Sequence, residues 1–198
     1  MIVLCPSAKV SGTYRSALTA AQDFPDADIR VVDTEVIGPA LGTLVKKSLK
    51  WVSEGMSADE IVKKVKELGK KVKIYFYVDT LEYLHRGGRI GTAKALVGSL
   101  LQVKPILLFK DGEVNAFESQ RTKKKALARI IDLVDQECPK NQSSELAILE
   151  ADAMDDAREL KIRFQEIARI SSVDIADLPP AIIVHAGPGV LAASFFTE

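Results

Sequence analysis

The sequence is poor in the residues from which most metal and disulfide sites are built. Cys5 and Cys138 are the only cysteines, and they lie far apart without the spacing of a metal-binding motif. His85 and His185 are the only histidines, and neither has a second metal-type residue at a regular ligand spacing. We therefore expect two buried or half-buried thiols and no metal site.

Long hydrophobic runs and an excess of one charge are missing as well. Lysine plus arginine and aspartate plus glutamate each number 27, and such a balance disfavours a polyanionic partner such as nucleic acid. No apolar run approaches the roughly 20 residues that span a bilayer. The apolar start at residues 2–4 is too short for a signal peptide and has no basic leader. These features predict a cytoplasmic protein without a membrane span or a nucleic-acid partner.

The common catalytic motifs do not occur in the chain either. It contains no P-loop, no G-x-G-x-x-G after a strand, no G-x-S-x-G and no HExxH. Ser11 as nucleophile and His185 as base form a pair that the residue types allow, but no third orienting residue can be named. We therefore expect a protein that is not an enzyme, with a phosphotransferase or hydrolase using this pair as an alternative.

The residues that are present predict an α/β fold. Hydrophobic residues make up 47% of the chain and charged residues 27%, which is typical of a globular protein with an ample core. Residues 2–5 predict a buried strand, residues 15–21 a helix and residues 29–32 the next strand. Ligands of such units tend to lie beyond the carboxyl ends of the strands, where helix amino termini offer N–H groups to anions. Ser11 and Thr13 occupy that position, although ordinary helix capping also explains them.

Two further helices complete the first part of the pattern. Residues 38–52 predict a core helix, and Ser57 with Glu60 predicts a capping box at the start of the next one. The α/β pattern then pauses, so we expect two domains, residues 1–72 and residues 73–198. The expected core face of the first of these helices consists of Leu41, Leu44, Val45, Ser48 and Leu49.

A second series of strands and helices follows in the later part of the chain. Asp111 and Gly112 between two apolar runs predict a hairpin turn. Lysines at 123–125 oppose the dipole of the helix that they begin, which indicates either an interaction surface or, more simply, a solvated basic end. The expected strands are residues 74–78, 105–109, 114–119, 146–149 and 182–184, with 190–196 a strand or a barely covered tail, and the expected helices are residues 93–101, 123–134 and 154–170.

Two adjacent glycines, Gly87 and Gly88, predict a tight corner, because glycine adopts backbone geometries that other residues rarely adopt. Arg86 and Arg89 flank this corner. Two arginines beside two glycines suggest an anion site, but the motifs described next favour other residues for that role. We interpret the two arginines as brace or surface residues.

Several separated motifs closely resemble the DegV family. They are SGTY at residues 11–14, LEYLHRGGRI at 81–90, SLLQVKPIL at 99–107 and HAGPG at 185–189. The resemblance implies two α/β domains of the DegV type, the EDD fold, with a lipid cleft between them. It also implies a lipid carrier that binds a long-chain fatty acid as its ligand and uses no cofactor. Some members serve as the acyl-carrying subunit of a bacterial fatty acid kinase, so the kinase catalytic subunit is an implied partner.

The resemblance also assigns roles to individual residues. Ser11 helps to hold the fatty-acid carboxylate, and Gly12 and Thr13 shape the same loop. His185, with Gly187 of the same motif, is a further lipid-binding candidate, since a carboxylate is bound by hydroxyl, imidazolium or N–H donors. Arg121 is implied as a contact for the kinase partner or as a charge near the acyl headgroup.

The chain departs from the family pattern at its amino terminus. A typical member carries an additional segment of roughly the first quarter of the protein, which includes a threonine that also holds the carboxylate. The present sequence begins at the strand before SGTY, so we expect a truncated first domain. The alternative is a shortened paralogue without ligand that acts as an interaction or structural protein. An exposed sheet edge would also favour a homo-oligomer.

Overall fold

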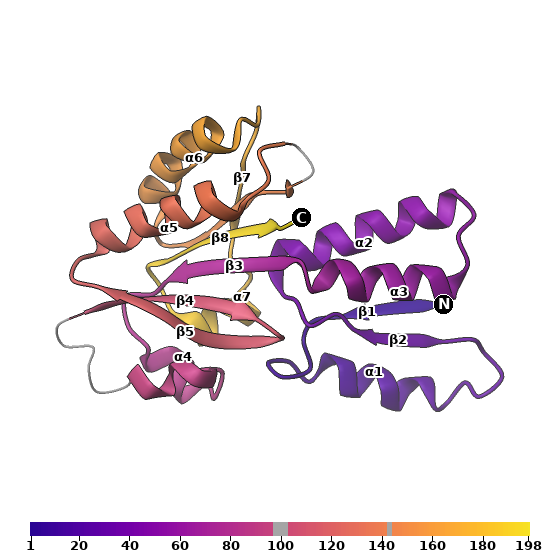
Figure 1. Cartoon of the computed structure of the whole chain (residues 1–198). Coiled ribbons are helices and arrows are strands. Elements are labelled where there is room, and N and C mark those ends of the chain that lie inside the picture. Colours follow the sequence, from indigo (N-terminus) through magenta and orange to yellow (C-terminus); the bar gives the residue numbers. More distant parts are fainter. Residues whose placement is uncertain (97–102, 142–143) are drawn as a thin grey trace. The chain divides into compact units, whose positions relative to one another are not determined.

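The computed structural model describes residues 1–96, 103–141 and 144–198. These residues form two compact units, which Figure 1 shows in the colours of the sequence. The first unit consists of Met1–Val72 with Asp111–Glu113, and the second of Lys73–Lys110 with Val114–Glu198. Strands and helices alternate in both units, so the predicted α/β class is confirmed. The division into domains at residue 72 stays a prediction.

The first unit contains a parallel strand pair. In this pair, β1 (Ile2–Cys5) lies beside β2 (Arg30–Asp33) with Ile2 opposite Arg30. Parallel neighbours need a crossover connection, and α1 (Thr13–Ala21) supplies it. Figure 1 shows α1 on one face of the pair and α2 (Gly38–Ser53) with α3 (Ala58–Gly69) on the other.

The core face of α2 is narrower than the sequence pattern predicted. Leu44 and Ser48 are buried as expected, together with Ala40. Val45 and Leu49 are 39% and 65% exposed, so their placement in the core was wrong. The buried residues follow a single i, i+4, i+8 row, and residues one position further along point about 100° away from it.

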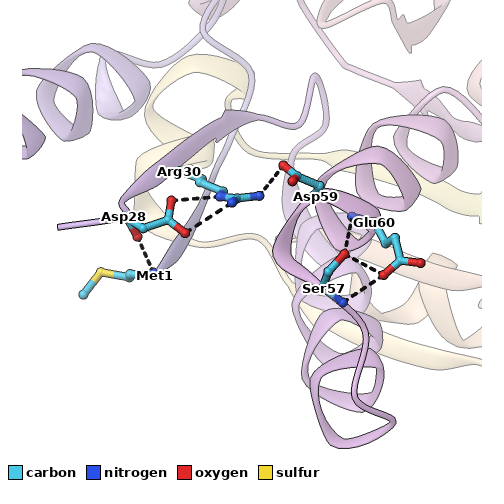
Figure 2. A network of polar contacts seen from close by, with 6 residues as sticks. All are labelled: Met1, Asp28, Arg30, Ser57, Asp59 and Glu60. Carbon is cyan, nitrogen blue, oxygen red and sulfur yellow. Dashed lines mark hydrogen bonds and ion pairs between the residues drawn. The ribbon is translucent and has the colours of Figure 1, made fainter.

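The beginning of α3 is fixed by the predicted capping box (Figure 2). The backbone N–H of Ser57 donates to Glu60 Oε2 at 2.9 Å, and the backbone N–H of Glu60 donates to Ser57 Oγ at 3.4 Å. Next to it, the Arg30 guanidinium pairs with the carboxylates of Asp28 and Asp59. This exposed network ties the start of β2 to the first turn of α3.

The second unit is built on one six-stranded mixed sheet. Its strand order is β5-β4-β3-β8-β6-β7. All seven residues of β8 are buried, and β8 lies between β3 and β6, so residues 190–196 form a central strand. The strands are β3 (Val72–Tyr77), β4 (Lys104–Lys110), β5 (Glu113–Gln120), β6 (Ala147–Ala151), β7 (Asp174–Asp177) and β8 (Val190–Phe196).

Helices cover both faces of this sheet (Figure 1). On one face, α5 (Lys123–Glu137) and α6 (Met154–Ala168) enclose the main core. On the other face lie α4 (Glu82–Arg86) and α7 (Pro180–Ala186). The largest fully buried side chains of the main core are Tyr75, Tyr77, Phe164 and Phe195.

The predicted hairpin turn is confirmed between β4 and β5. Asp111 and Gly112 have φ angles of 53° and 79°. Two consecutive positive φ angles are those of a type I′ turn, whose twist suits a two-residue hairpin.

Three expectations for the second unit need correction. Residues 182–184 were predicted as a strand but belong to α7, because Pro180 occupies a position in its first turn and the run is too short to show a period. The strand β7 (Asp174–Asp177) was not predicted, since aspartates bound it at both ends. The helix predicted at 93–101 is a 3₁₀ helix over Gly91–Leu96, and its remainder falls outside the described residues.

Both cysteines are buried free thiols, as predicted. Burial raises the pKa of the Cys5 thiol, and Asp33 adds to this shift. Burial also raises the pKa of the Cys138 thiol. Across residues 1–96, 103–141 and 144–198, none of the helices has both the length and the apolar character needed to cross a bilayer.

Candidate headgroup-binding residues

The SGT turn, residues 11–13, leads into α1, which begins at Thr13. The Ser11 hydroxyl lies 2.9 Å from the Thr13 hydroxyl and accepts a hydrogen bond from the backbone N–H of Thr13 at 3.2 Å. This bond between residues two apart forms a serine turn just before α1. The N-cap residue of α1 is Gly12 and no side chain caps the helix, so the simpler interpretation of Ser11 and Thr13 as capping residues was wrong. The hydroxyl pair is also exposed, so this turn leaves both oxygen atoms accessible to a ligand.

Backbone donors follow this hydroxyl pair along the chain. The first backbone bond of α1 runs from the N–H of Ser16 to the carbonyl of Gly12 at 3.0 Å. The N–H groups of Tyr14 and Arg15 precede it and have no backbone acceptor within the described chain. Free N–H groups at a helix start favour an anion. The turn thus combines hydroxyl and amide donors of the kind that bind a carboxylate.

A buried serine supports the loop that leads to this turn. Ser7 is fully buried, and its hydroxyl donates to the carbonyl of Gly112 at 2.6 Å. The same oxygen accepts the backbone N–H of Lys9 at 3.3 Å, and the Ser7 carbonyl accepts the N–H of Ser11 at 3.0 Å. These hydrogen bonds fix the loop that leads to Ser11.

His185 lies at the end of α7 in the second unit. Its Nδ1 is buried and has no hydrogen-bond partner among the described residues. Burial and, to a smaller extent, the nearby Arg89 cation lower the pKa of His185. At neutral pH the imidazole is therefore neutral, and it offers an N–H donor rather than the positive charge of an imidazolium.

The surroundings of His185 come from the motif at residues 81–90. A Cβ at Gly87 would overlap Nδ1 of His185 and lie 3.2 Å from its Cε1. A Cβ at Gly187 would lie 2.8 Å from Cε2 of the Tyr83 ring. The helices α4 and α7 therefore contact each other at these two glycines. The His185 ring lies against Gly87, and the Tyr83 ring lies against Gly187.

The remaining predicted residues are placed as follows. Arg121 is exposed and lies just before Thr122, whose hydroxyl accepts the N–H of Lys125 at 3.2 Å at the start of α5. Lys123 pairs with Asp156 at 2.7 Å, so only part of the basic start is simply solvated. Among the described residues, no cluster of three or more His, Cys, Asp and Glu side chains could hold a metal ion.

Comparison with known sequences gives a match along the whole chain. The model of a family described as uncharacterised proteins, the DegV family, matches residues 1–198. The chain belongs to the DegV family. A DegV domain-containing protein from Halalkalibacterium halodurans is 34% identical over 192 residues, which are 97% of this chain and 68% of the relative. Protein DegV from Bacillus subtilis is 35% identical over 190 residues, or 93% of this chain and 66% of the relative.

Solved DegV structures share the fold of the chain. A fatty acid binding DegV family protein from Streptococcus agalactiae has a TM-score of 0.89 at 28% identity, and the match covers 100% of this chain and 71% of that one. A Thermus thermophilus DegV family protein, described for its fatty acid binding, has a TM-score of 0.87 at 30% identity, with coverages of 100% and 70%. These DegV neighbours are fatty-acid-binding proteins of α/β architecture.

Within this DegV chain, the SGT turn belongs to the first unit, whereas His185, Gly187 and Arg121 belong to the second. The sequence did not identify the contacts of Tyr83 and Gly87 around His185. The available signal was the LEYLHRGGRI motif itself, which was interpreted as a tight corner with brace or surface arginines and not as a support for His185. Arg86 pairs with Glu82 at 2.7 Å on the surface, and Arg89 donates to the Gly87 carbonyl at 2.5 Å.

Proposed function

We propose that this protein binds a long-chain fatty acid and holds its carboxylate with Ser11, Gly12 and Thr13 and with His185 and Gly187. The observation that carries the proposal is the exposed hydroxyl pair of Ser11 and Thr13, 2.9 Å apart, beside unpaired amide donors at the start of α1. The DegV structures of similar fold that are described as fatty-acid-binding support it.

The apolar tail supplies most of the binding free energy in this proposal. Burying one methylene contributes about 0.8 kcal/mol, whereas a hydrogen bond to a charged group contributes about 1.5–3 kcal/mol. The headgroup residues therefore select the carboxylate among lipids of equal length. Their removal should reduce the preference for an acid over the matching alcohol more than it reduces lipid binding as such.

The test is lipid extraction and native mass spectrometry of the purified protein, followed by calorimetry with palmitate and with hexadecanol. Ser11→Ala should weaken palmitate binding about tenfold and leave hexadecanol binding nearly unchanged. Ser16→Ala is the matched control, because Ser16 is an exposed serine of the same helix. A protein that carries no acyl ligand and binds no palmitate would refute the proposal.

A finer part of the proposal concerns a protein partner. We propose that the bound acyl carboxylate is presented to a fatty acid kinase catalytic subunit and that the exposed Arg121 contacts this partner. This chain itself then needs no catalytic residues. Arg121→Gln should abolish phosphorylation of the bound fatty acid by the added kinase subunit and leave palmitate affinity within twofold. Unchanged phosphorylation would remove Arg121 from the partner contact.

The second candidate is a ligand-free protein that acts through interactions. The exposed apolar row of Val45, Leu49 and Val52 on α2 favours it, because such residues are often covered by a partner or a second copy. This candidate predicts a homo-oligomer in sedimentation experiments that Leu49→Glu dissociates, together with the absence of acyl ligand in native mass spectra.

A further inference from the structure

The two glycines of the LEYLHRGGRI motif differ in their backbone conformations. Gly88 has a φ of 69°, and the bonds from Gly88 N–H to the His85 carbonyl (3.1 Å) and from Arg89 N–H to the Leu84 carbonyl (2.9 Å) form a Schellman motif. Gly88 occupies the left-handed position of that motif, where glycine is preferred. The end of α4 therefore explains why residue 88 is glycine.

Gly87 has no such conformational reason. Its φ and ψ are −75° and −8°, in the right-handed helical region that every residue adopts. Glycine is disfavoured there relative to alanine, because it loses more backbone entropy on folding. The space around it gives the reason: a Cβ at Gly87 would overlap His185 Nδ1, whereas one at Gly88 would meet no atom of the described chain within 4 Å.

The contact between Gly87 and His185 fixes the imidazole. The ring lies directly against the backbone of residue 87, which buries Nδ1 without a hydrogen-bond partner in the described chain. Nε2, the other ring nitrogen, is not among the buried atoms of the described chain that lack a hydrogen-bond partner. The Gly87 carbonyl is itself held by the Arg89 guanidinium at 2.5 Å, so the surface behind the ring is anchored.

We propose that Gly87 is a positioning residue for His185. Because Gly87 has no side chain, the imidazole of His185 packs against the end of α4, and Nε2 is the nitrogen offered to an acyl carboxylate. The ligand part of this inference rests on the proposed function, whereas the seating of the ring does not. Nδ1 is buried and has no acceptor in the described chain for a proton of its own, which favours the tautomer with the proton on Nε2 and makes Nε2 a hydrogen-bond donor. The GGRI motif then acts on the headgroup through His185.

The experiment uses Gly87→Ala, His185→Ala and the double variant, with Gly88→Asn as the control that tolerates a left-handed backbone. Gly87→Ala should weaken palmitate binding about tenfold in the original protein and by less than twofold in the His185→Ala background. Gly88→Asn should bind palmitate within twofold of the original protein. Equal loss in both backgrounds, or no loss while His185→Ala weakens binding, would overturn the proposal.

A ligand-free measurement separates this inference from the proposed function. In ¹⁵N-edited NMR of the apo protein, His185 should titrate below the ordinary value of about 6.5, and Gly87→Ala should move the titration towards that value as the ring leaves its seat. This shift supports the positioning role even if His185→Ala leaves palmitate binding unchanged, which would refute only the headgroup assignment. An unshifted titration overturns the positioning role.

Misfolding of Gly87→Ala would also be informative. If the new methyl group clashes with the imidazole, the double variant with His185→Ala should fold, because the clash partner has been removed. Its recovery, measured by circular dichroism and thermal melting, supports the contact. If the double variant is also unfolded, residue 87 acts through another neighbour and the proposal is wrong.

Discussion

The structure describes every residue of α1 in the first unit, and none of the nine is buried. In contrast, all seven residues of β8 in the second unit are buried. The same contrast holds for the candidate ligand-binding groups of the two units. Ser11 is held by a serine turn and a hydrogen-bonded loop, and His185 is held by van der Waals contact with Gly87. Substitutions of the exposed Ser11 and Thr13 hydroxyls should therefore change ligand binding with little effect on folding, whereas substitutions around His185 should change both.

The largest expected effect compares one residue type in the two settings. Leu191 of β8 is fully buried, and Leu18 of α1 is 41% exposed. Leu191→Ala should cost about 2–5 kcal/mol of unfolding free energy, because it leaves a cavity in a packed core. Leu18→Ala should stay within about 0.5 kcal/mol. Urea denaturation measures both, and similar costs would erase the contrast between the units.

A polar substitution tests how the loop before Ser11 is held. Ser7→Ala removes the donor to the Gly112 carbonyl and leaves that carbonyl without its bond of 2.6 Å. A buried group left unsatisfied costs about 1–3 kcal/mol. We expect a loss in this range by urea denaturation and faster hydrogen exchange at the Ser11 amide. A neutral Ser7→Ala with unchanged exchange would show that apolar packing holds the loop after all.

A pH experiment addresses a polar contact at the edge of the larger unit. Arg129 donates to both oxygens of Glu118 at 2.9 and 2.7 Å and lowers the pKa of that carboxyl. A lowered pKa contributes stability above the unfolded value of about 4.3, and this contribution is lost as the pH falls through the folded value.

Glu118→Gln should therefore be less stable than the original protein at pH 7, by less than about 1 kcal/mol. The difference should vanish once Glu118 is protonated in acid. Denaturation at several pH values measures it, and a difference that persists at low pH would assign the effect to packing.

The smallest effect is expected in the network of Figure 2. Asp59 is 91% exposed although it pairs with Arg30. Exposed pairs are screened by water and salt, so Asp59→Asn should leave the melting temperature unchanged within error. A clear drop at low salt that disappears in 1 M salt would show that this network stabilises the smaller unit more than its exposure suggests.

The fold was predictable where local signals were unambiguous. Ser57 and Glu60 marked the start of α3, and Asp111-Gly112 marked the hairpin, because each signal acts within four residues. The apolar run at residues 182–184 gave no period, and the helix there depends on Pro180 and on packing of Ala186. Only tertiary contacts decide between strand and helix in such a run.

The candidate headgroup residues follow the same division. Ser11 and Thr13 could be located from the strand–loop–helix order, whereas the capping alternative for them was wrong, because no side chain caps α1. His185 was identified through the family resemblance. Its neutral state and its seat on Gly87 depend on desolvation and on a neighbour distant in sequence, which no local pattern records.

The position of β8 has a consequence for the order of folding. This strand lies beside β3 in the centre of the sheet, although more than a hundred residues of chain separate Tyr77 from Val190. During synthesis, β3, β4 and β5 emerge long before the strand that joins them to β6. Contacts of such sequence separation form slowly and leave apolar surface exposed meanwhile. The second unit is therefore expected to fold only after residues 190–196 have been synthesised. Until then, chaperones are expected to bind its exposed apolar surface.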